Sequence, residues 1–473
     1  MLPAKRKRNI YKSFGFYLTI LFLIGNAIGL ILIWGTNIYD NAVVQYLTIE
    51  DNGSFYKIWR DPKINVIVKI YPFNYTNFEA VVAGKEKPKV QEIGPYVFRE
   101  NNIKSNVKFN GNENVTFSYS RTLTFLHNLS KGTLNDTLIT PNVIFIASLD
   151  KVSKDKLQKM GLSVILALFK SKPFITVSSY KFLMGYDDNF SLILRRINTL
   201  LRNEVHPPFG ILSKRTGLSE DTITIGTGIP ESNHIGIIKK YNDDEKLDIW
   251  YDSECNNITA SDGFIFPGRL TSDSDVIYVY AKDLCRRIPL KFEKEYTDEN
   301  GYPVRRFVLP KNVYSTPDIN PDNSCFCSVD SCPISGIHNV SSCFYDAPFV
   351  VSQPHFMYGD PELFENVEGL EPHPEKHTYY MDLHKNFGFP LKGHTRVQVG
   401  IVIKKGTPLS RLKPLSNGTV LPICWMDFEL ESLPENINSL MYAASLIKNL
   451  MKWGFLVLFI VVIFTLIYYV SLT

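Results

Sequence analysis

The sequence lacks the short motifs that mark common enzyme classes. It has no G-x-S-x-G turn of a hydrolase, and no glycine-rich loop of the G-x-x-x-x-G-K or G-x-G-x-x-G type that binds nucleotide phosphates. Segment 373–377 resembles a zinc-protease helix, but its glutamate follows the first histidine by two places instead of one, and Pro374 favours a turn. We therefore expect a protein that is not an enzyme and has no cofactor or metal.

A strong net charge is also missing. The formal net charge is +4, and basic residues do not alternate with aromatic ones as they do on nucleic-acid-binding surfaces. No nucleic acid is expected among the partners.

Cysteine is scarce and unevenly placed. Six of the seven cysteines lie between Cys255 and Cys343. No pair of C-x-x-C knuckles occurs among them, which argues against structural zinc and favours a disulfide framework. Spacing alone does not choose among the many pairings that six cysteines permit. The remaining Cys424 is most simply a buried thiol and less readily a reactive one.

Two long apolar runs lie near the ends of the chain. Residues 14–34 contain no formal charge and, as a helix, would be about 31 Å long, which matches the hydrocarbon core of a bilayer. Residues 454–470 form a shorter run at the lower end of the spanning range. The expected organisation is a tail (1–13), a span (14–34), an ectodomain (35–452), a second span (453–470) and a tail (471–473).

Charges beside the spans predict the orientation. Lys5, Arg6, Lys7, Arg8 and Lys12 precede the first span and predict a cytoplasmic N-terminus. Two spans then return the C-terminus to the cytoplasm. Lys448 and Lys452, on the outer flank of the second span, argue against this, but the N-terminal cluster is larger and enters the membrane first.

The first span contains a possible packing motif. Gly25 and Gly29 have the G-x-x-x-G spacing that lets membrane helices approach closely. The motif predicts contact with the second span or with a second copy of the chain, and glycines that simply face lipid are the alternative.

The region between the spans carries the marks of an oxidising, glycosylating compartment. All nine Asn-x-Ser/Thr sequons lie there, at Asn52, Asn74, Asn114, Asn128, Asn135, Asn189, Asn257, Asn339 and Asn417.

The same region is predicted to be rich in strands. Runs 64–73, 114–125 and 276–284 alternate with period two and contain many β-branched and aromatic residues. Segments 153–172 and 189–202 have helical spacing instead. The pattern predicts an antiparallel β domain with a small helical insertion.

Collinear segments across nearly the whole chain resemble the class B scavenger receptors. The most specific is FEAVVAGKEKPKVQEIGPYVFRE at 78–100, followed by PFITVSSYKFLMGYDD (173–188), FGIL (209–212), ECNNITASDGFIFP (254–267), DLCRRI (283–288), SQPHF (352–356) and LPICW (421–425). The resemblance implies an α+β membrane protein. Its large antiparallel β-barrel-like ectodomain would carry an apical helical bundle, here 150–205, and an internal apolar tunnel, between two transmembrane helices.

The resemblance also implies a set of partners and pairings. Family members bind lipids, fatty acids, lipoproteins or anionic phospholipid surfaces and pass lipid towards the bilayer. The implied disulfides are Cys255–Cys325, Cys285–Cys343 and Cys327–Cys332, within region 255–343. Lys170 and Lys172 match a basic pair that contacts anionic ligands, and nearby lysines extend it: Lys151, Lys154, Lys156 and Lys159. A solvated helix face is the alternative reading of these lysines.

Departures from the family pattern bear on location. Met184 stands where the family usually has tryptophan, the tails lack the cysteines that surface members palmitoylate, and the acidic dileucine-type signal of the lysosomal branch is missing. We therefore expect the plasma membrane, with a lysosomal or endosomal membrane as the alternative. A protein-binding adhesion or enzyme-sorting receptor without lipid transport is the alternative function.

Overall fold

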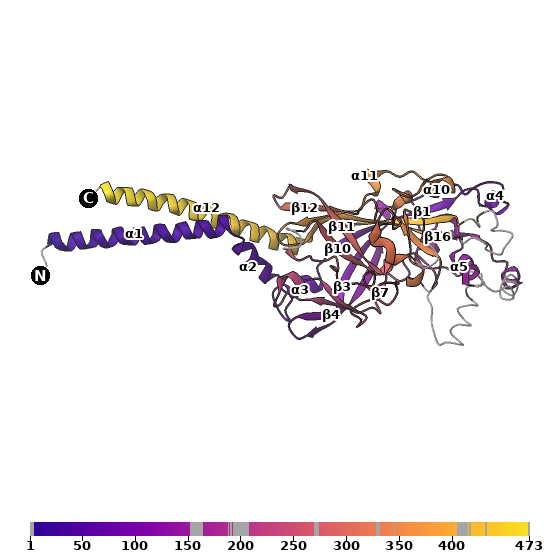
Figure 1. Cartoon of the computed structure of the whole chain (residues 1–473), viewed down its shortest axis with the longest axis horizontal. Coiled ribbons are helices and arrows are strands. Elements are labelled where there is room, and N and C mark those ends of the chain that lie inside the picture. Colours follow the sequence, from indigo (N-terminus) through magenta and orange to yellow (C-terminus); the bar gives the residue numbers. More distant parts are fainter. Residues whose placement is uncertain are drawn as a thin grey trace. The chain divides into compact units, whose positions relative to one another are not determined.

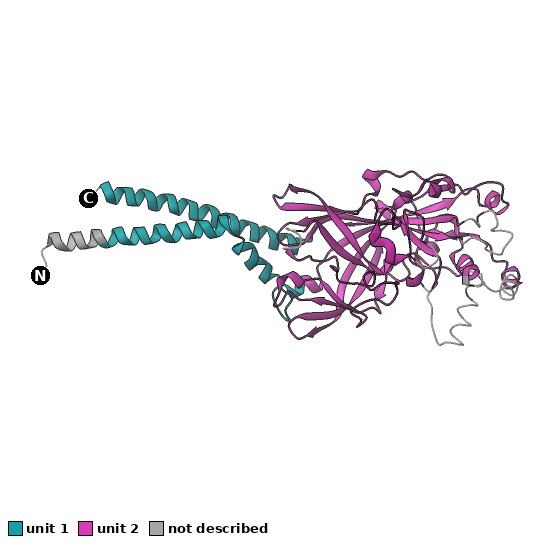
Figure 2. Ribbon diagram, viewed as in Figure 1, with its two compact units in different colours: residues 1–58, 434–473 teal, residues 59–433 magenta. Residues whose placement is uncertain are grey.

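The computed structural model describes residues 4–151, 164–187, 189, 192, 208–268, 274–327, 332–344, 346–403, 415, 418–430 and 433–471, with the backbone alone for 4–13 and 151. The chain divides into two compact units (Figure 2). One consists of residues 1–58 and 434–473, and the other of residues 59–433.

The smaller unit is helical. It contains α1 (Ala4–Gly35), α2 (Ile38–Tyr46) and α12 (Glu435–Ser471), and α1 and α12 pack side by side (Figure 1). Both long helices are long and apolar enough to cross a membrane, as the apolar runs predict. Residues 435–452 continue the second span as one uninterrupted helix.

The lysines on the outer flank of the second span have partners within this unit. The Lys448 ammonium group contacts both carboxylate oxygens of Asp40 in α2, at 2.7 and 2.6 Å. The Lys452 ammonium lies 5.3 Å from the centre of the Trp34 ring, within the range of a cation–π interaction. These contacts give Lys448 and Lys452 a structural role, which explains why basic residues occur on the flank where the rule for membrane orientation does not expect them.

The two glycines of the G-x-x-x-G spacing differ in what they face. A Cβ atom added to Gly29 would lie 2.6 Å from the Phe455 ring of α12, whereas one added to Gly25 would meet nothing within 4 Å. Gly29 is therefore the position at which α1 and α12 need a residue without a side chain.

We predict that Gly29→Leu weakens this helix pair and that Gly25→Leu does not. The new side chain at Gly29 would overlap Phe455, and overpacking of this kind costs roughly 1–3 kcal/mol. Thermal unfolding of the detergent-solubilised full-length chain measures the effect. Equal unfolding midpoints for the two variants would contradict the assignment.

The larger unit is built on a 15-stranded antiparallel sheet. Its strands are β1 (Asn65–Tyr75), β2 (Val90–Glu92), β3 (Tyr96–Asn110), β4 (Asn114–Phe125), β7 (Gly217–Leu218), β8 (Ile223–Gly226), β9 (Ile238–Tyr241), β10 (Val276–Ala281), β11 (Arg286–Thr297), β12 (Pro303–Val308), β13 (Ile337–Asn339), β14 (Phe349–Ser352), β15 (Tyr380–His384), β16 (Pro390–Val402) and β17 (Val420–Leu430). The three predicted strand runs correspond to β1, β4 and β10.

Short helices and a second sheet accompany the large one. The second sheet pairs β5 (Thr137–Pro141) with β6 (Phe174–Ser178). The α-helices in the described residues are α3 (Tyr56–Arg60), α4 (Phe78–Val82), α5 (Val143–Lys151), α7 (Ser179–Met184), α10 (Pro361–Glu365) and α11 (Pro374–His377). Of the two predicted helical segments, residues 164–168 are helical, and nearly all of 189–202 lies outside the described residues.

The large sheet nearly closes on itself. The strand path runs β10-β11-β12-β15-β16-β17-β1-β3-β4-β8-β9. Ser261 bridges Ile237, just before β9, to Val279 in β10, and so joins the two ends of the path. The strands therefore have an inner and an outer face.

The inner face forms one apolar core. Strands from opposite parts of the path contribute to the same hydrophobic cluster, including Val68 of β1, Phe98 of β3, Ile277 of β10 and Phe307 of β12. These inward-pointing side chains belong to one cluster, which also includes residues that do not point inward. Alternate residues point outward.

Candidate functional site

The inner face of β16 and β17 is apolar but only partly buried. Four of its side chains belong to the edge of the main hydrophobic cluster and keep intermediate solvent exposure: Val397, Val399, Met426 and Phe428. The alternate, outward-pointing residues of the same strands are polar but buried, with exposed fractions of 9% for Arg396, 0% for Gln398 and 4% for Asp427. In most barrel strands the inward-pointing apolar side chains are buried and the outward-pointing polar ones are exposed, so burial is reversed here.

The outer face is buried because the chain covers it and the charges are paired. The 3₁₀ helix η6 (Pro354–Phe356) packs on β16. Asp427 accepts hydrogen bonds from Arg396 Nε at 3.3 Å and from His394 Nδ1 at 2.9 Å. Pairing and hydrogen bonding offset much of the cost of burying these charges.

Elsewhere the inner face is filled. Lys104 of β3 is 2% exposed, donates to the Trp59 carbonyl at 2.9 Å, and lies 4.1 Å from the Phe264 ring centre. Burial lowers the pKa of Lys104 to about 8. Lys104 and the Phe264 ring therefore fill the interior of the sheet near Ser261.

A charged pair also faces inward. Glu100 of β3 is 2% exposed and contacts Arg215 Nε at 3.1 Å, and the Arg215 guanidinium lies 4.5 Å from the Phe428 ring centre. Burial alone would raise the pKa of Glu100, but the charges of Arg215 and Arg121, together with hydrogen bonds from Arg215 and Asn102, outweigh it and lower the pKa below its usual value. The partly exposed apolar side chains of β16 and β17 therefore lie next to the ion pair of Glu100 and Arg215.

Two of the six predicted ligand-binding lysines have described side chains. Lys170 and Lys172 are exposed and follow helical residues 164–168. Three apolar side chains of that turn are also exposed: Val164 (57%), Ile165 (42%) and Leu168 (73%). Lys154, Lys156 and Lys159, and the side chain of Lys151, lie outside the described residues.

A third group of polar residues lies on the outer face of the sheet. Glu92 of β2 accepts hydrogen bonds from His355 Nε2 at 2.6 Å and from Trp425 Nε1 at 2.7 Å. The His377 ring stacks on the His355 ring, with centres 4.6 Å apart and planes 8° apart. Glu92, His355 and His377 are close enough together to suggest a metal site.

The hydrogen bonds of both histidines disfavour a metal. The backbone N–H of Glu371 donates to His355 Nδ1, and that of His373 donates to His377 Nδ1, each at 3.0 Å. A neutral imidazole with Nδ1 occupied as an acceptor carries its proton on Nε2. A metal ligand needs the opposite arrangement, with a bare Nε2 and a donating Nδ1. The cluster is therefore a hydrogen-bonded network that fixes segment 371–377 against β17.

Burial and neighbouring charge set the protonation of this network. Burial, followed by the nearby His355, lowers the pKa of His377 to about 3. For Glu92, hydrogen bonds from His355 and Trp425 outweigh the effect of burial and lower its pKa. His377 is thus neutral when folded at pH values where the unfolded chain binds a proton.

We predict that acid weakens the fold through His377. Since the unfolded residue titrates near 6.5 and the folded one near 3, stability is lost as the pH falls below 6.5, by roughly 1–2 kcal/mol at pH 5. His377→Gln keeps an acceptor for the His373 N–H but cannot titrate, so its unfolding midpoint should depend less on pH. The exposed His127→Gln is the matched control, and an unchanged pH profile for His377→Gln would contradict the prediction.

The three disulfides of the structure join the pairs that the resemblance implies: Cys255–Cys325, Cys285–Cys343 and Cys327–Cys332. Cys424 is a buried free cysteine, and burial raises the pKa of its thiol above the usual range. Among the sequons, Asn52, Asn128, Asn135, Asn189 and Asn339 are exposed, Asn74, Asn114 and Asn257 are partly exposed, and Asn417 lies outside the described residues.

Sequence patterns identified some members of these groups but not their association. Glu92, His355 and Trp425 fall within segments that carry the family resemblance. His377 is the second histidine of segment 373–377, which was compared above with a zinc-protease helix. Their contacts join positions separated by 263 and 333 residues, which no local pattern relates.

Comparison with known proteins agrees with this architecture. The family model described as the CD36 family matches residues 17–471. Scavenger receptor class B member 1 of Bos taurus is 29% identical over 89% of this chain and 81% of that protein, and its Sus scrofa counterpart is 28% identical over 90% and 82%. Lysosome membrane protein 2 of Homo sapiens is 28% identical over 77% and 75%. Since the family model covers nearly the whole chain, this protein belongs to the CD36 family.

Proposed function

We propose that this protein is a receptor for lipid-bearing particles that admits single lipid molecules to the inside of its sheet. The observation that carries the proposal is the reversed burial on β16 and β17. Apolar side chains of the inner face remain accessible there, while the polar outer face is buried. An accessible, concave apolar lining is the environment that an acyl chain or sterol favours.

The helical residues 164–168 and the two lysines after them are the proposed docking surface. Val164, Ile165 and Leu168 offer exposed apolar area, and Lys170 and Lys172 add positive charge at its border. Apolar side chains with flanking lysines suit the surface of a lipid particle, which is apolar beneath an anionic or zwitterionic layer. The similarity to proteins named scavenger receptor class B member 1 supports this role.

We also propose that the receptor acts at the plasma membrane with both termini in the cytoplasm. The basic cluster before the first span supports this orientation. Relatives named lysosome membrane protein 2 make a lysosomal membrane the alternative.

Reversal of charge at the docking surface should reduce capture. We predict that Lys170→Glu with Lys172→Glu lowers uptake of labelled lipoprotein lipid by about tenfold at low ionic strength, because attraction of an anionic surface becomes repulsion. The control is Lys291→Glu with Lys294→Glu, which reverses two exposed lysines of β11. Equal uptake by both double variants, at equal surface expression, would remove Lys170 and Lys172 from the docking surface.

A larger side chain inside the sheet should affect lipid transfer without affecting the binding of lipid particles. We predict that Val399→Trp blocks lipid transfer, leaves particle binding intact, and hardly changes stability, because the side chain enters accessible space. The inner-face control Val68→Trp replaces a fully buried residue and should destabilise the protein by roughly 1–3 kcal/mol. Equal destabilisation by both substitutions would mean that the interior is filled at Val399. Normal transfer by a stable Val399→Trp variant would favour a receptor that binds protein partners without passing lipid.

A further inference from the structure

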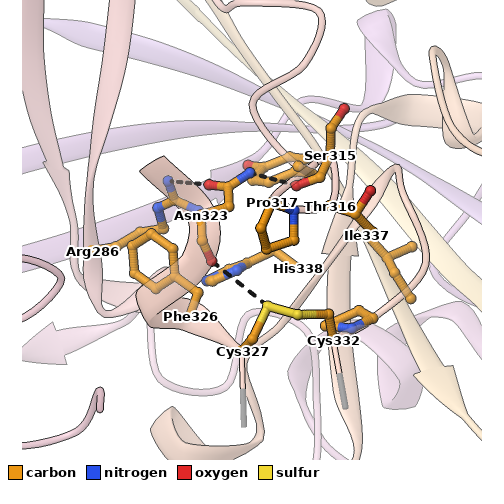
Figure 3. A pocket seen from close by; sticks show the side chains of 12 residues that line it. Arg286, Ser315, Thr316, Pro317, Asn323, Phe326, Cys327, Cys332, Ile337 and His338 are labelled. Atoms are coloured by element: carbon orange, nitrogen blue, oxygen red, sulfur yellow. Dashed lines mark hydrogen bonds between the residues drawn. A yellow bond between two sulfur atoms is a disulfide. The ribbon is translucent and has the colours of Figure 1, made fainter. Parts of the chain in front are cut away.

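A small cavity lies within the disulfide-bonded region (Figure 3). It is bounded by Arg286 at the start of β11, Asn323 and Phe326 of η4 (Pro321–Phe326), His338 of β13, and the disulfide Cys327–Cys332. Its volume of about 20 Å³ is enough for one water-sized particle. None of these residues takes part in the proposed docking surface or in the apolar lining.

Arg286 brings an uncompensated charge to this cavity. It is only 4% exposed, and in the part of the chain that the structure describes its Nε and Nη1 atoms have no hydrogen-bond partner. Its remaining contacts are with neutral groups. Nη2 donates to Asn323 Oδ1 over a long 3.5 Å, and the guanidinium lies 3.9 Å from the centre of the Phe326 ring.

A partly buried and a buried arginine of this unit, Arg306 and Arg396, have carboxylate partners. Arg306 donates to both oxygens of Asp382 at 2.7 Å, and Arg396 donates to Asp427 at 3.3 Å. Arg286 has no ion pair with any residue in the described part of the chain. Since a buried charge needs compensation, an ordered group of opposite charge in the cavity would complete the site.

His338 is the other polar wall. It is 5% exposed, its ring packs against Phe326 with centres 5.0 Å apart, and its Nε2 has no hydrogen-bond partner among the described residues. Burial, followed by the charge of Arg286, lowers the pKa of His338 well below its ordinary value. The imidazole is therefore neutral, and the net charge at the cavity is that of Arg286.

We propose that this cavity binds one small monovalent anion, of the halide class, on the free Nε–H and Nη1–H groups of Arg286. Its small volume favours an ion of this size over a carboxylate-bearing lipid or a phosphate group. A halide accepts hydrogen bonds from several directions and neutralises the guanidinium. A water molecule would accept the same two hydrogen bonds and could donate to His338 Nε2, but it would leave the charge uncompensated.

The position of the site indicates a structural role. Arg286 follows Cys285, which is bonded to Cys343, and Cys327 and Cys332 border the cavity. An anion held there would bind β11, η4 and β13 together at the centre of the disulfide-bonded region.

Thermal unfolding of the full-length, detergent-solubilised chain tests the proposal. Sodium bromide or chloride is compared with sodium gluconate at equal ionic strength, because gluconate is too large for the cavity. The unfolding midpoint should rise in halide by about 2 °C and saturate with concentration, as ligand binding to the folded state requires. A midpoint equal in halide and gluconate would overturn the proposal and assign the cavity to water or to the chain itself.

Two neighbouring arginines provide a matched pair of variants. Arg286→Gln should abolish the halide dependence. Arg287→Gln should keep it, since Arg287 forms a surface ion pair with Glu254. Loss of the dependence in both variants would show a general salt effect and overturn the site. If Arg286→Gln does not fold, anomalous scattering from a bromide-soaked crystal of the unaltered protein decides the matter, by the presence or absence of a bromide at Arg286.

Discussion

Closure of the sheet at Ser261 is the constraint on which the rest of the larger unit depends. One serine pairs with Ile237 on one side and with Val279 on the other, and so turns an open antiparallel sheet into one with an inside. Each strand must then give alternate residues to the inner and the outer face. The division between apolar lining and polar outer surface follows from this geometry.

The strands β16 and β17 show how closure and coverage act together. Segment 352–379 crosses their outer face, where Glu92, His355 and Trp425 form hydrogen bonds and Asp427 pairs with Arg396 and His394. Every polar group that the cover buries needs a partner, and these pairs provide it. On the inner face, by contrast, the described side chains of Val397, Val399, Met426 and Phe428 remain partly exposed.

Charges inside the protein follow two patterns. Glu100 with Arg215, and Asp382 with Arg306, are ion pairs whose charges cancel. Lys104 and Arg286 instead rest against aromatic rings, and burial lowers the pKa of both. The first pattern links separate segments of the chain: β12 to β15 through Arg306 and Asp382, and β3 to the segment before β7 through Glu100 and Arg215. In the second, ring faces stabilise the positive charge, together with the Trp59 carbonyl at Lys104 and, in our proposal, a small anion at Arg286.

The sequence alone determined the features that depend on neighbouring residues. Apolar runs predicted α1 and α12, period-two alternation predicted β1, β4 and β10, and the order of short motifs indicated the family. The apolar runs and the alternating segments each lie within a few turns of helix or a single strand, and each family motif is short in itself. They also identified Glu92, His355 and Trp425 as members of family segments, without assigning them a contact.

Only the tertiary structure decided which distant groups meet. It paired Asp40 with Lys448 across 408 positions and Glu92 with His355 across 263. It showed that Gly29, and not Gly25, faces the second span. It left Arg286 without a carboxylate among the described residues, and it reversed burial on β16 and β17. The physical reason is that burial and charge compensation depend on the strands and loops that pack against a residue, and sequence periodicity specifies only the face on which the residue lies.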